Sequence, residues 1–284
     1  MMERRKSRFA AMLLFFTLAA LHVLLLDAIG ERVHQINCFS YETAFENFRS
    51  HSLTKEQIES FLQAADCDLE KYSELLTMYF ASGCRQTDPE VLADDISYVK
   101  KYRFEEFEAI RGYVEAVWKD LERFPVGDIA GEAEASVSFE NSWMQSRTFG
   151  GERGHEGTDI MPSVNQRGIY PVYSMTDGVV ENIGWLKLGG WRIGIRSPSG
   201  TYFYYAHLAE YAKEFAIGEE VEAGTFLGFM GDTGYSEEEG TTGNFAVHLH
   251  LGIYLNDENG TEFSVNSYPM LLYIKENEGT PQWK

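Results

Sequence analysis

The chain is poor in basic residues. It contains 24 lysines and arginines against 44 aspartates and glutamates among 284 residues, a formal net charge of −20. A protein that binds the backbone of DNA or RNA needs the opposite sign, because binding neutralises phosphate charges. We therefore expect no nucleic-acid partner. Hydrophobic residues make up 44% and aromatic residues 14% of the chain, which excludes a disordered protein.

Cysteine is also scarce. The chain has three, Cys38, Cys67 and Cys84, and none stands in a C-x-x-C pair or near a histidine. A cysteine metal site is therefore not expected. Cys67 and Cys84 flank an expected helix, and both a disulfide between them and buried free thiols agree with the sequence. The odd count leaves at least one thiol unpaired in either case.

A long apolar run covers residues 9–30 and follows a basic start at residues 4–8. About 18 of its residues, interrupted only by His22, can span the hydrocarbon core of a bilayer. The basic flank predicts a cytoplasmic N-terminus and an exported remainder. We predict a single-pass anchor in residues 1–30, with the rest of the chain outside the cell. A cleaved signal peptide, giving a secreted protein, is the alternative, although no clean A-x-A site follows.

Residues 31–130 show helical periodicity. Thr54 with Gln57 three residues later is a capping-box pattern, and Asp88 before Pro89 is a typical helix start. The aromatic stripes of these segments predict core packing. We predict a helical region over residues 31–130, whose role as spacer, inhibitor or partner-binding element stays open.

The pattern changes at residues 124–137, which are rich in proline, glycine and small residues. Short β-rich runs separated by glycine turns follow. We therefore predict an α+β chain: an N-terminal membrane helix, a helical region, and a mainly antiparallel β-sheet domain over residues 131–284.

Histidines are few and gather in the second half. Of seven, four lie after residue 130, and they fall in three short segments: His155, His207, and the pair His248 and His250. Asp159 stands four residues after His155. His248 and His250 point the same way on a strand, because side chains alternate faces.

Four imidazoles and one carboxylate suit a catalytic zinc site. Two histidines and a carboxylate can hold Zn²⁺ with a position left open, and the remaining charge lowers the pKa of a bound water. Two further imidazoles could accept a proton or hydrogen-bond an oxyanion. The chain has no H-E-x-x-H helix, so the common helical zinc site is excluded.

These motifs resemble a known family. H-x-G-x-D, a tyrosine-rich strand ending A-H-L, and H-L-H after a glycine-rich stretch are similar to the lysostaphin/LytM-type zinc metallopeptidases. The resemblance covers about residues 140–270 and includes the strand-and-turn pattern of residues 218–234. It implies a compact antiparallel sheet with a groove over one zinc ion, and a zinc endopeptidase that cleaves peptidoglycan peptides.

The resemblance also assigns roles. It implies that His155, Asp159 and His250 bind zinc, and that His207 and His248 are the catalytic pair. Some members have a tyrosine six residues before the first ligand, where this chain has Phe149. Either another residue, Tyr204 or Tyr205, replaces that tyrosine and contacts the substrate, or the role is absent.

Several matters stay open in the sequence. Residues 235–247 form a longer and more acidic approach to H-L-H than the family usually has, either a groove rim or a solvated loop tip. Arg153 either clamps a substrate carbonyl or carboxylate, or pairs with a neighbouring glutamate.

A non-catalytic wall- or partner-binding module is the alternative function. A biotinyl or lipoyl carrier is excluded, since no lysine stands at a hairpin tip. The bond cleaved and the oligomeric state are not determined.

Overall fold

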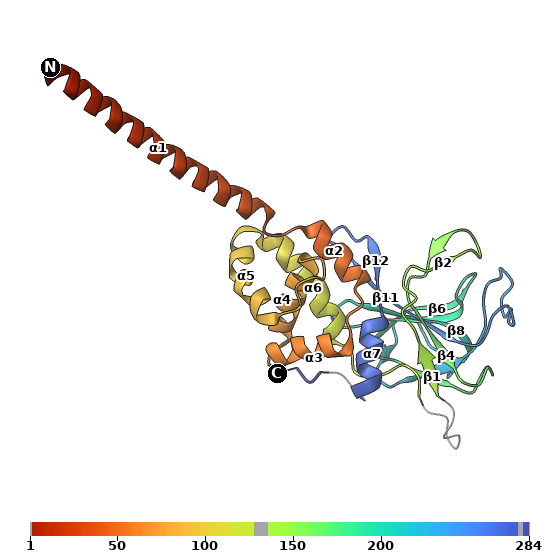
Figure 1. Cartoon of the computed structure of the whole chain (residues 1–284). Coiled ribbons are helices and arrows are strands. Elements are labelled where there is room, and N and C mark those ends of the chain that lie inside the picture. The colour runs from red at the N-terminus through yellow and green to blue at the C-terminus, as the bar shows by residue number, and fades with distance from the viewer. Residues whose placement is uncertain (1, 128–135, 278–280, 284) are drawn as a thin grey trace.

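The computed structural model describes residues 2–127, 136–277 and 281–283. Figure 1 shows helices in the first part of the chain and strands in the second, which confirms the predicted α+β arrangement. The helices are α1 (Met2–Asn37), α2 (Tyr41–Ser50), α3 (Lys55–Ala64), α4 (Leu69–Ala81), α5 (Pro89–Tyr102), α6 (Phe104–Lys119) and α7 (Tyr268–Asn277). The predicted boundary at residues 124–137 falls largely on residues 128–135, which lie outside the described part. The division at residue 130 stays a prediction.

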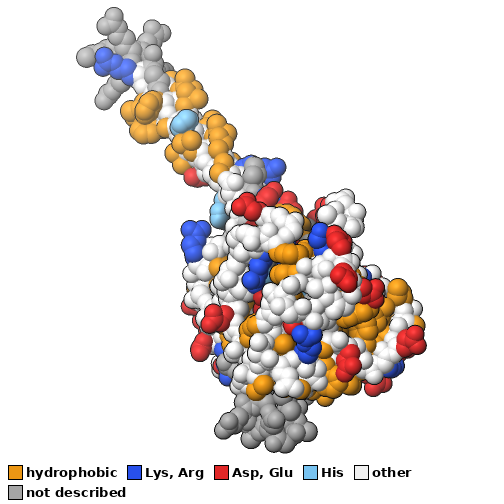
Figure 2. All heavy atoms as spheres, turned by 90° about the vertical axis from the view of Figure 1, so that its right-hand side faces the viewer, with side chains coloured by type: hydrophobic (Ala, Val, Ile, Leu, Met, Phe, Trp, Pro, Cys, Tyr) orange, Lys and Arg blue, Asp and Glu red, His pale blue; other side chains and the backbone are white. Residues whose placement is uncertain are grey.

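Helix α1 projects from the rest of the molecule (Figure 1). Its stretch Arg8–Gln35 is long and apolar enough to cross a membrane, with a mean hydropathy of 2.5 and none of its apolar window buried. Figure 2 shows these hydrophobic side chains exposed along the helix. An N-terminal signal sequence can meet the same criteria of length and composition. Of the basic residues that precede the run, only Arg8 has a described side chain.

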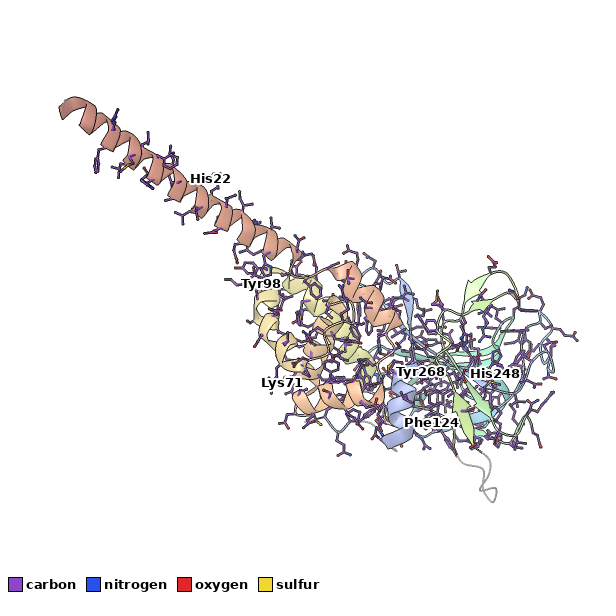
Figure 3. The ribbon with its side chains drawn as sticks, viewed as in Figure 1. His22, Lys71, Tyr98, Phe124, His248 and Tyr268 are labelled. Atoms are coloured by element: carbon purple, nitrogen blue, oxygen red, sulfur yellow. The ribbon has the colours of Figure 1, made fainter. Side chains whose placement is uncertain are left out.

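The base of α1 contacts α5. Figure 3 shows Tyr98 at this position, where its hydroxyl donates a hydrogen bond to Glu31 at 3.1 Å. The His34 and Tyr98 rings pack with centroids 5.0 Å apart. These contacts fix the end of α1 on the helical region.

Local sequence signals explain where the other helices begin. The Thr54 hydroxyl accepts a hydrogen bond from the Gln57 N–H at 3.3 Å, and the Gln57 amide oxygen accepts one from the Thr54 N–H at 3.0 Å. This reciprocal capping box confirms the predicted start of α3. Asp88 caps α5 through the Glu90 N–H, directly before Pro89.

The cysteines are free. Cys38, Cys67 and Cys84 are each partly buried, and no disulfide joins them. Of the two possibilities that the sequence left for Cys67 and Cys84, the structure shows free thiols.

The β-strands form one ten-stranded antiparallel sheet and a separate two-stranded ribbon, β2–β3. The order along the main path is β1-β4-β11-β8-β7-β6-β9, and β10, β5 and β12 pair at its sides. The strands are β1 (Val137–Phe139), β2 (Ser146–Arg147), β3 (Arg153–Gly154), β4 (Thr158–Pro162), β5 (Pro171–Tyr173), β6 (Gly178–Leu186), β7 (Gly190–Arg196), β8 (Tyr202–Tyr211), β9 (Glu220–Val221), β10 (Phe226–Met230), β11 (Leu249–Asn256) and β12 (Glu262–Val265).

The helical region packs against one side of the sheet. The Phe263 ring of β12 lies 4.9 Å from the Phe45 ring of α2 and 5.1 Å from the Tyr113 ring of α6. The Thr201 hydroxyl donates to the Ala116 carbonyl at 2.8 Å. The buried side chains of helices and sheet therefore form one continuous core.

His51 is a buried titratable group in this interface. Its ring is 4% exposed and stacks on Phe80 at 5.0 Å between centroids, and its Nδ1 atom has no hydrogen-bond partner. Its backbone carbonyl accepts a hydrogen bond from the Asn266 amide at 2.8 Å. Burial lowers the pKa of His51 to about 3. The folded protein therefore holds this imidazole neutral.

We expect His51 to make the fold sensitive to acid. In the unfolded chain its pKa is about 6.5, so below that pH the unfolded state takes up a proton that the folded state does not. The stabilisation is fully present above about pH 6.5 and is lost towards pH 3, with a loss of about 2 kcal/mol by pH 5. Urea unfolding of wild type and His51→Phe at about pH 7.5 and about pH 5 measures this. The variant, which keeps an aromatic ring on Phe80, should lose about 2 kcal/mol less. An equal loss in both proteins would assign the acid sensitivity to other groups.

Candidate active site

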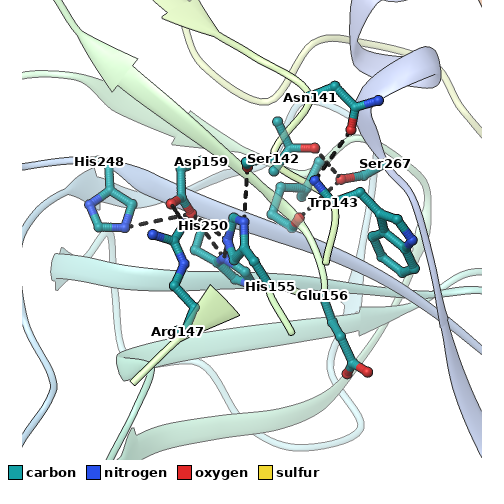
Figure 4. Close-up of polar contacts among 12 residues, drawn as sticks. Asn141, Ser142, Trp143, Arg147, His155, Glu156, Asp159, His248, His250 and Ser267 are labelled. Atoms are coloured by element: carbon teal, nitrogen blue, oxygen red, sulfur yellow. Dashed lines mark hydrogen bonds and ion pairs between the residues drawn. The ribbon is translucent and has the colours of Figure 1, made fainter. Parts of the chain in front are cut away.

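Three neighbouring segments bring the first donor groups together. In the antiparallel pairing of β4 with β11, Asp159 lies directly opposite His250. His155 precedes β4 and is buried, and its Nδ1 atom hydrogen-bonds the Ser142 hydroxyl at 2.9 Å. This bond fixes the ring so that Nε2 faces the other two residues (Figure 4).

The donor atoms of these residues form a compact triangle. His155 Nε2 lies 2.9 Å from Asp159 Oδ1, His250 Nδ1 lies 3.0 Å from the same oxygen, and the two nitrogens are 3.0 Å apart. Tetrahedral Zn²⁺ with bonds of about 2.0–2.1 Å has ligand–ligand distances of about 3.3 Å. Two imidazoles and one carboxylate are also the donors that zinc prefers. The three residues therefore fit a zinc ion, with a further position open.

Arg147 orients the carboxylate of this triangle. Its Nη2 atom donates to Asp159 Oδ2 at 2.6 Å, which leaves Oδ1 to face the histidines. Burial raises the pKa of Asp159, but hydrogen bonds from His155 and His250 outweigh it and hold the pKa well below its usual range. The carboxylate is therefore ionised, as a metal ligand must be.

The glycine of H-x-G-x-D makes room for His250. A Cβ atom at Gly157 would lie 2.7 Å from Cε1 of the His250 ring and 2.6 Å from the Leu251 carbonyl oxygen. Any side chain at this position would displace the ring or the β11 backbone. The motif therefore supplies two donors and the space for the third.

His207 reaches the same side of the sheet through a β-bulge. In β8, Phe203 and Tyr205 point into the core, and regular alternation would send His207 there too. However, Arg192 of β7 faces two residues of β8, because the paired positions on either side are Ile193 with Tyr205 and Trp191 with Leu208. His207 has a φ of 64°, a left-handed conformation that costs about 1–2 kcal/mol for a residue other than glycine.

Backbone carbonyls set the protonation of His207 and His248. Nδ1 of His207 bonds the Thr233 carbonyl and Nδ1 of His248 bonds the Ala246 carbonyl, each at 2.8 Å. A carbonyl can only accept, so each Nδ1 carries a proton, and in the neutral form of either ring Nε2 is the acceptor. Burial, with the nearby His248 and His250, lowers the pKa of His207 well below its ordinary value.

The two rings lie beside the donor triangle. Their centroids are 4.6 Å apart, and His248 Nε2 is 3.7 Å from Asp159 Oδ1. The structure therefore brings together all five residues that the sequence singled out, as two groups: three convergent donors and two neighbouring acceptors.

These groups line one end of a cavity of about 520 Å³ over the sheet. Tyr204 lines this groove, with its ring 6.0 Å from that of His250. Tyr205 does not, and its predicted contact with substrate is wrong. It is completely buried on the opposite face of β8, and its hydroxyl accepts a hydrogen bond from the Met175 N–H at 2.8 Å.

Tyrosine rings lying over glycines form the groove floor. A Cβ atom at Gly252 would meet the Tyr254 ring at 2.5 Å. A Cβ at Gly194 would collide with the Tyr202 hydroxyl, and one at Gly189 with the Tyr204 hydroxyl. The glycines thus let the three rings, which are inclined to one another, lie close to the sheet and form an aromatic floor.

Comparison with known proteins identifies the family. Residues 153–262 match the sequence profile of peptidase family M23. A crystal structure of a protein from Ruminococcus gnavus, described as a putative glycyl-glycine endopeptidase lytM, is 40% identical, with a TM-score of 0.66 over 81% of this chain and 90% of that chain. The chain belongs to peptidase family M23.

Two curated relatives of this M23 peptidase are endopeptidases. The L-Ala–D-Glu endopeptidase of Bacillus subtilis is 46% identical over 134 residues, which cover 47% of this chain and 39% of the relative. The glycyl-glycine endopeptidase ALE-1 of Staphylococcus capitis is 30% identical over 130 residues, 43% of this chain and 32% of the relative. The matched part thus spans well under half of each curated relative.

In this M23 peptidase the residue at the position of the family's tyrosine contacts a neighbouring loop. Phe149 stacks on Tyr235, with ring centroids 4.5 Å apart and planes 6° apart. Tyr235 lines the groove, 5.9 Å from the His207 ring between centroids. Tyr235 was not predicted as a groove residue, because only the folded loops bring it to Phe149.

The acidic loop of the M23 domain is exposed. Glu237, Glu238 and Glu239 all face solvent, and Glu237 pairs with Lys187 at 2.6 Å. None of the three lines the groove. Of the two interpretations of this loop, the structure favours the solvated tip.

Proposed function

We propose that this chain is a zinc-dependent endopeptidase that cleaves peptide bonds of cell-wall peptidoglycan. The observation that carries the proposal is the triangle of His155 Nε2, Asp159 Oδ1 and His250 Nδ1 at distances of 2.9–3.0 Å, with the His207 and His248 rings beside it. Membership in a peptidase family supports the reaction class.

In this proposal His155, Asp159 and His250 hold one Zn²⁺. Zinc bound there would polarise the substrate carbonyl and lower the pKa of a bound water. Arg147 keeps the Asp159 carboxylate turned towards the ion. The remaining chemistry belongs to His207 and His248.

The two acceptor nitrogens account for the proton transfers. Nε2 of His248 or His207 takes the proton of the attacking water, since both Nδ1 atoms are already protonated. The imidazolium formed can donate that proton to the leaving amine. The peptide would lie over Tyr204, which lines the floor of the groove.

For the bond cleaved, we propose the type named for the Bacillus relative, between L-Ala and D-Glu in the peptidoglycan stem. The identity of 46% to that relative supports this choice, whereas the ALE-1 relative at 30% and the lytM structure at 40% are both described as glycyl-glycine endopeptidases. For location, we propose that α1 anchors the chain with the groove outside the membrane. The exposed apolar stretch Arg8–Gln35 supports an anchor, and a cleaved signal peptide is the alternative.

The test uses the zinc-loaded full chain in detergent, incubated with peptidoglycans of different stem and bridge chemistry. We expect fragments with new D-Glu amino termini, detected by mass spectrometry. A zinc chelator should stop their release by at least about tenfold, and added Zn²⁺ should restore it. Binding to the wall without any released fragment would favour the non-catalytic module instead.

A further inference from the structure

Two arginines of the groove have no acidic partner. Arg153 and Arg192 both line the cavity, and among the described residues neither forms an ion pair. Nε of Arg153 and Nη1 of Arg192 are buried without a hydrogen-bond partner. Arg147, the third arginine of the groove, differs because it is bound to Asp159. Buried guanidinium nitrogens without acceptors are unusual and call for a ligand.

Arg192 is placed by the same bulge that places His207. Across the sheet, Asp159 pairs with His250, His250 pairs with Ala206, and Arg192 faces Ala206 and His207. Strands are about 4.8 Å apart, so the Arg192 backbone lies about 10 Å from that of His250. An arginine side chain at this distance can reach a substrate residue next to a bond held at the donor triangle.

Both guanidinium groups influence the pKa of Tyr204, which lies on the groove floor. Burial raises the pKa of Tyr204, while the positive charges of Arg192 and Arg153 lower it. The two arginines, on β7 and β3, line the same groove as Tyr204. Each carries a positive charge into the groove of a chain whose net charge is −20.

The positive charges of Arg153 and Arg192 are not neutralised by an ion pair among the described residues. Arg153 stands directly opposite Arg147 in the β2–β3 ribbon, where like charges destabilise the pairing. Glu156 and Glu262 also line the groove, but both are exposed and neither pairs with an arginine. An anionic ligand would supply the acceptors that Arg153 and Arg192 lack.

We propose that Arg192, assisted by Arg153, binds a free carboxylate on the substrate residue next to the scissile bond. A guanidinium presents two parallel N–H groups that match a carboxylate. Glutamate joined to the next residue through one of its carboxyl groups keeps the other free, whereas a glycine–glycine bond offers none. This inference rests on the proposed function and narrows its substrate to acidic stem peptides.

The test compares two synthetic peptides, L-Ala–D-Glu–L-Lys joined through the glutamate side chain, with the α-carboxyl group either free or amidated. We expect the wild-type full chain to prefer the free carboxylate by about 10- to 100-fold in kcat/KM. Arg192→Gln should lower kcat/KM for that peptide by a similar factor and leave the amidated peptide within about twofold. Arg192→Lys, which keeps the charge and loses the paired N–H groups, should fall between.

Arg85→Gln is the matched control, since it removes an exposed arginine of the helical region. Calorimetric binding of both peptides to the zinc-loaded His248→Gln chain separates this inference from the proposed function. A carboxylate preference in binding without hydrolysis in wild type would contradict the proposed function and support the inference. Equal use and equal binding of both peptides, or an Arg192→Gln defect that is the same for both, would overturn the inference.

Discussion

His250→Ala should lose zinc and activity together. The substitution removes one corner of the donor triangle and leaves Asp159 Oδ1 with a single ring nitrogen, His155 Nε2, at 2.9 Å. Two protein donors hold zinc far more weakly than three, and the charge stabilisation that the ion provides is worth several kcal/mol. We expect metal content well below one ion per chain after dialysis, and a fall in kcat/KM of about 10³-fold or more. Elemental analysis and peptide hydrolysis on the same sample measure both.

His34→Ala is the control for loss of a histidine outside the groove, since His34 is exposed near the base of α1. It should keep both zinc and activity. His155→Ala and Asp159→Ala should behave like His250→Ala. Full zinc content in His250→Ala would show that this residue is not a ligand, whatever happens to the activity.

Replacing the acceptor histidines should separate activity from metal binding. His248→Ala removes an Nε2 atom that lies 3.7 Å from Asp159 Oδ1 but leaves the triangle intact. General acid–base catalysis contributes about 10²- to 10⁴-fold, so we expect a loss of that size in kcat with zinc still bound. At His207 the better variant is asparagine, because it tolerates the left-handed backbone at φ 64°. His207→Asn should show the same separation.

Thermal unfolding of each variant checks that the fold persists. If His248→Ala and His207→Asn both lost zinc, the division into three ligands and two acceptors would be wrong. If both kept zinc and lost less than about tenfold in kcat, neither would be the general base.

The sequence predicted the order of helices and sheet and the five polar residues of the site. His155 and Asp159 stand four residues apart around Gly157, and His248 and His250 two apart, so short-range geometry limits where they can point. The resemblance to a known family then suggested their roles. Those roles are the proposals that the histidine variants test.

Long-range pairing was beyond the sequence. The bulge opposite Arg192 reverses the alternation in β8, so His207 shares a face with Tyr204 and not with Tyr205. No local signal marks that reversal, and this is why Tyr205 was wrongly considered for the groove. Arg147 and Arg192 were also missed, since only register across separate strands brings them to the histidines.

The tyrosines that lie over glycines limit how the groove floor can change in evolution. Each of Tyr202, Tyr204 and Tyr254 occupies the volume that a side chain on its glycine would need. A larger residue at the glycine is blocked while the ring remains, and a smaller residue at the tyrosine leaves a gap over bare backbone. The two members of each pair therefore constrain one another, and the floor can drift only by paired substitutions. Single substitutions that alter specificity are therefore expected at groove positions outside these glycine–tyrosine pairs.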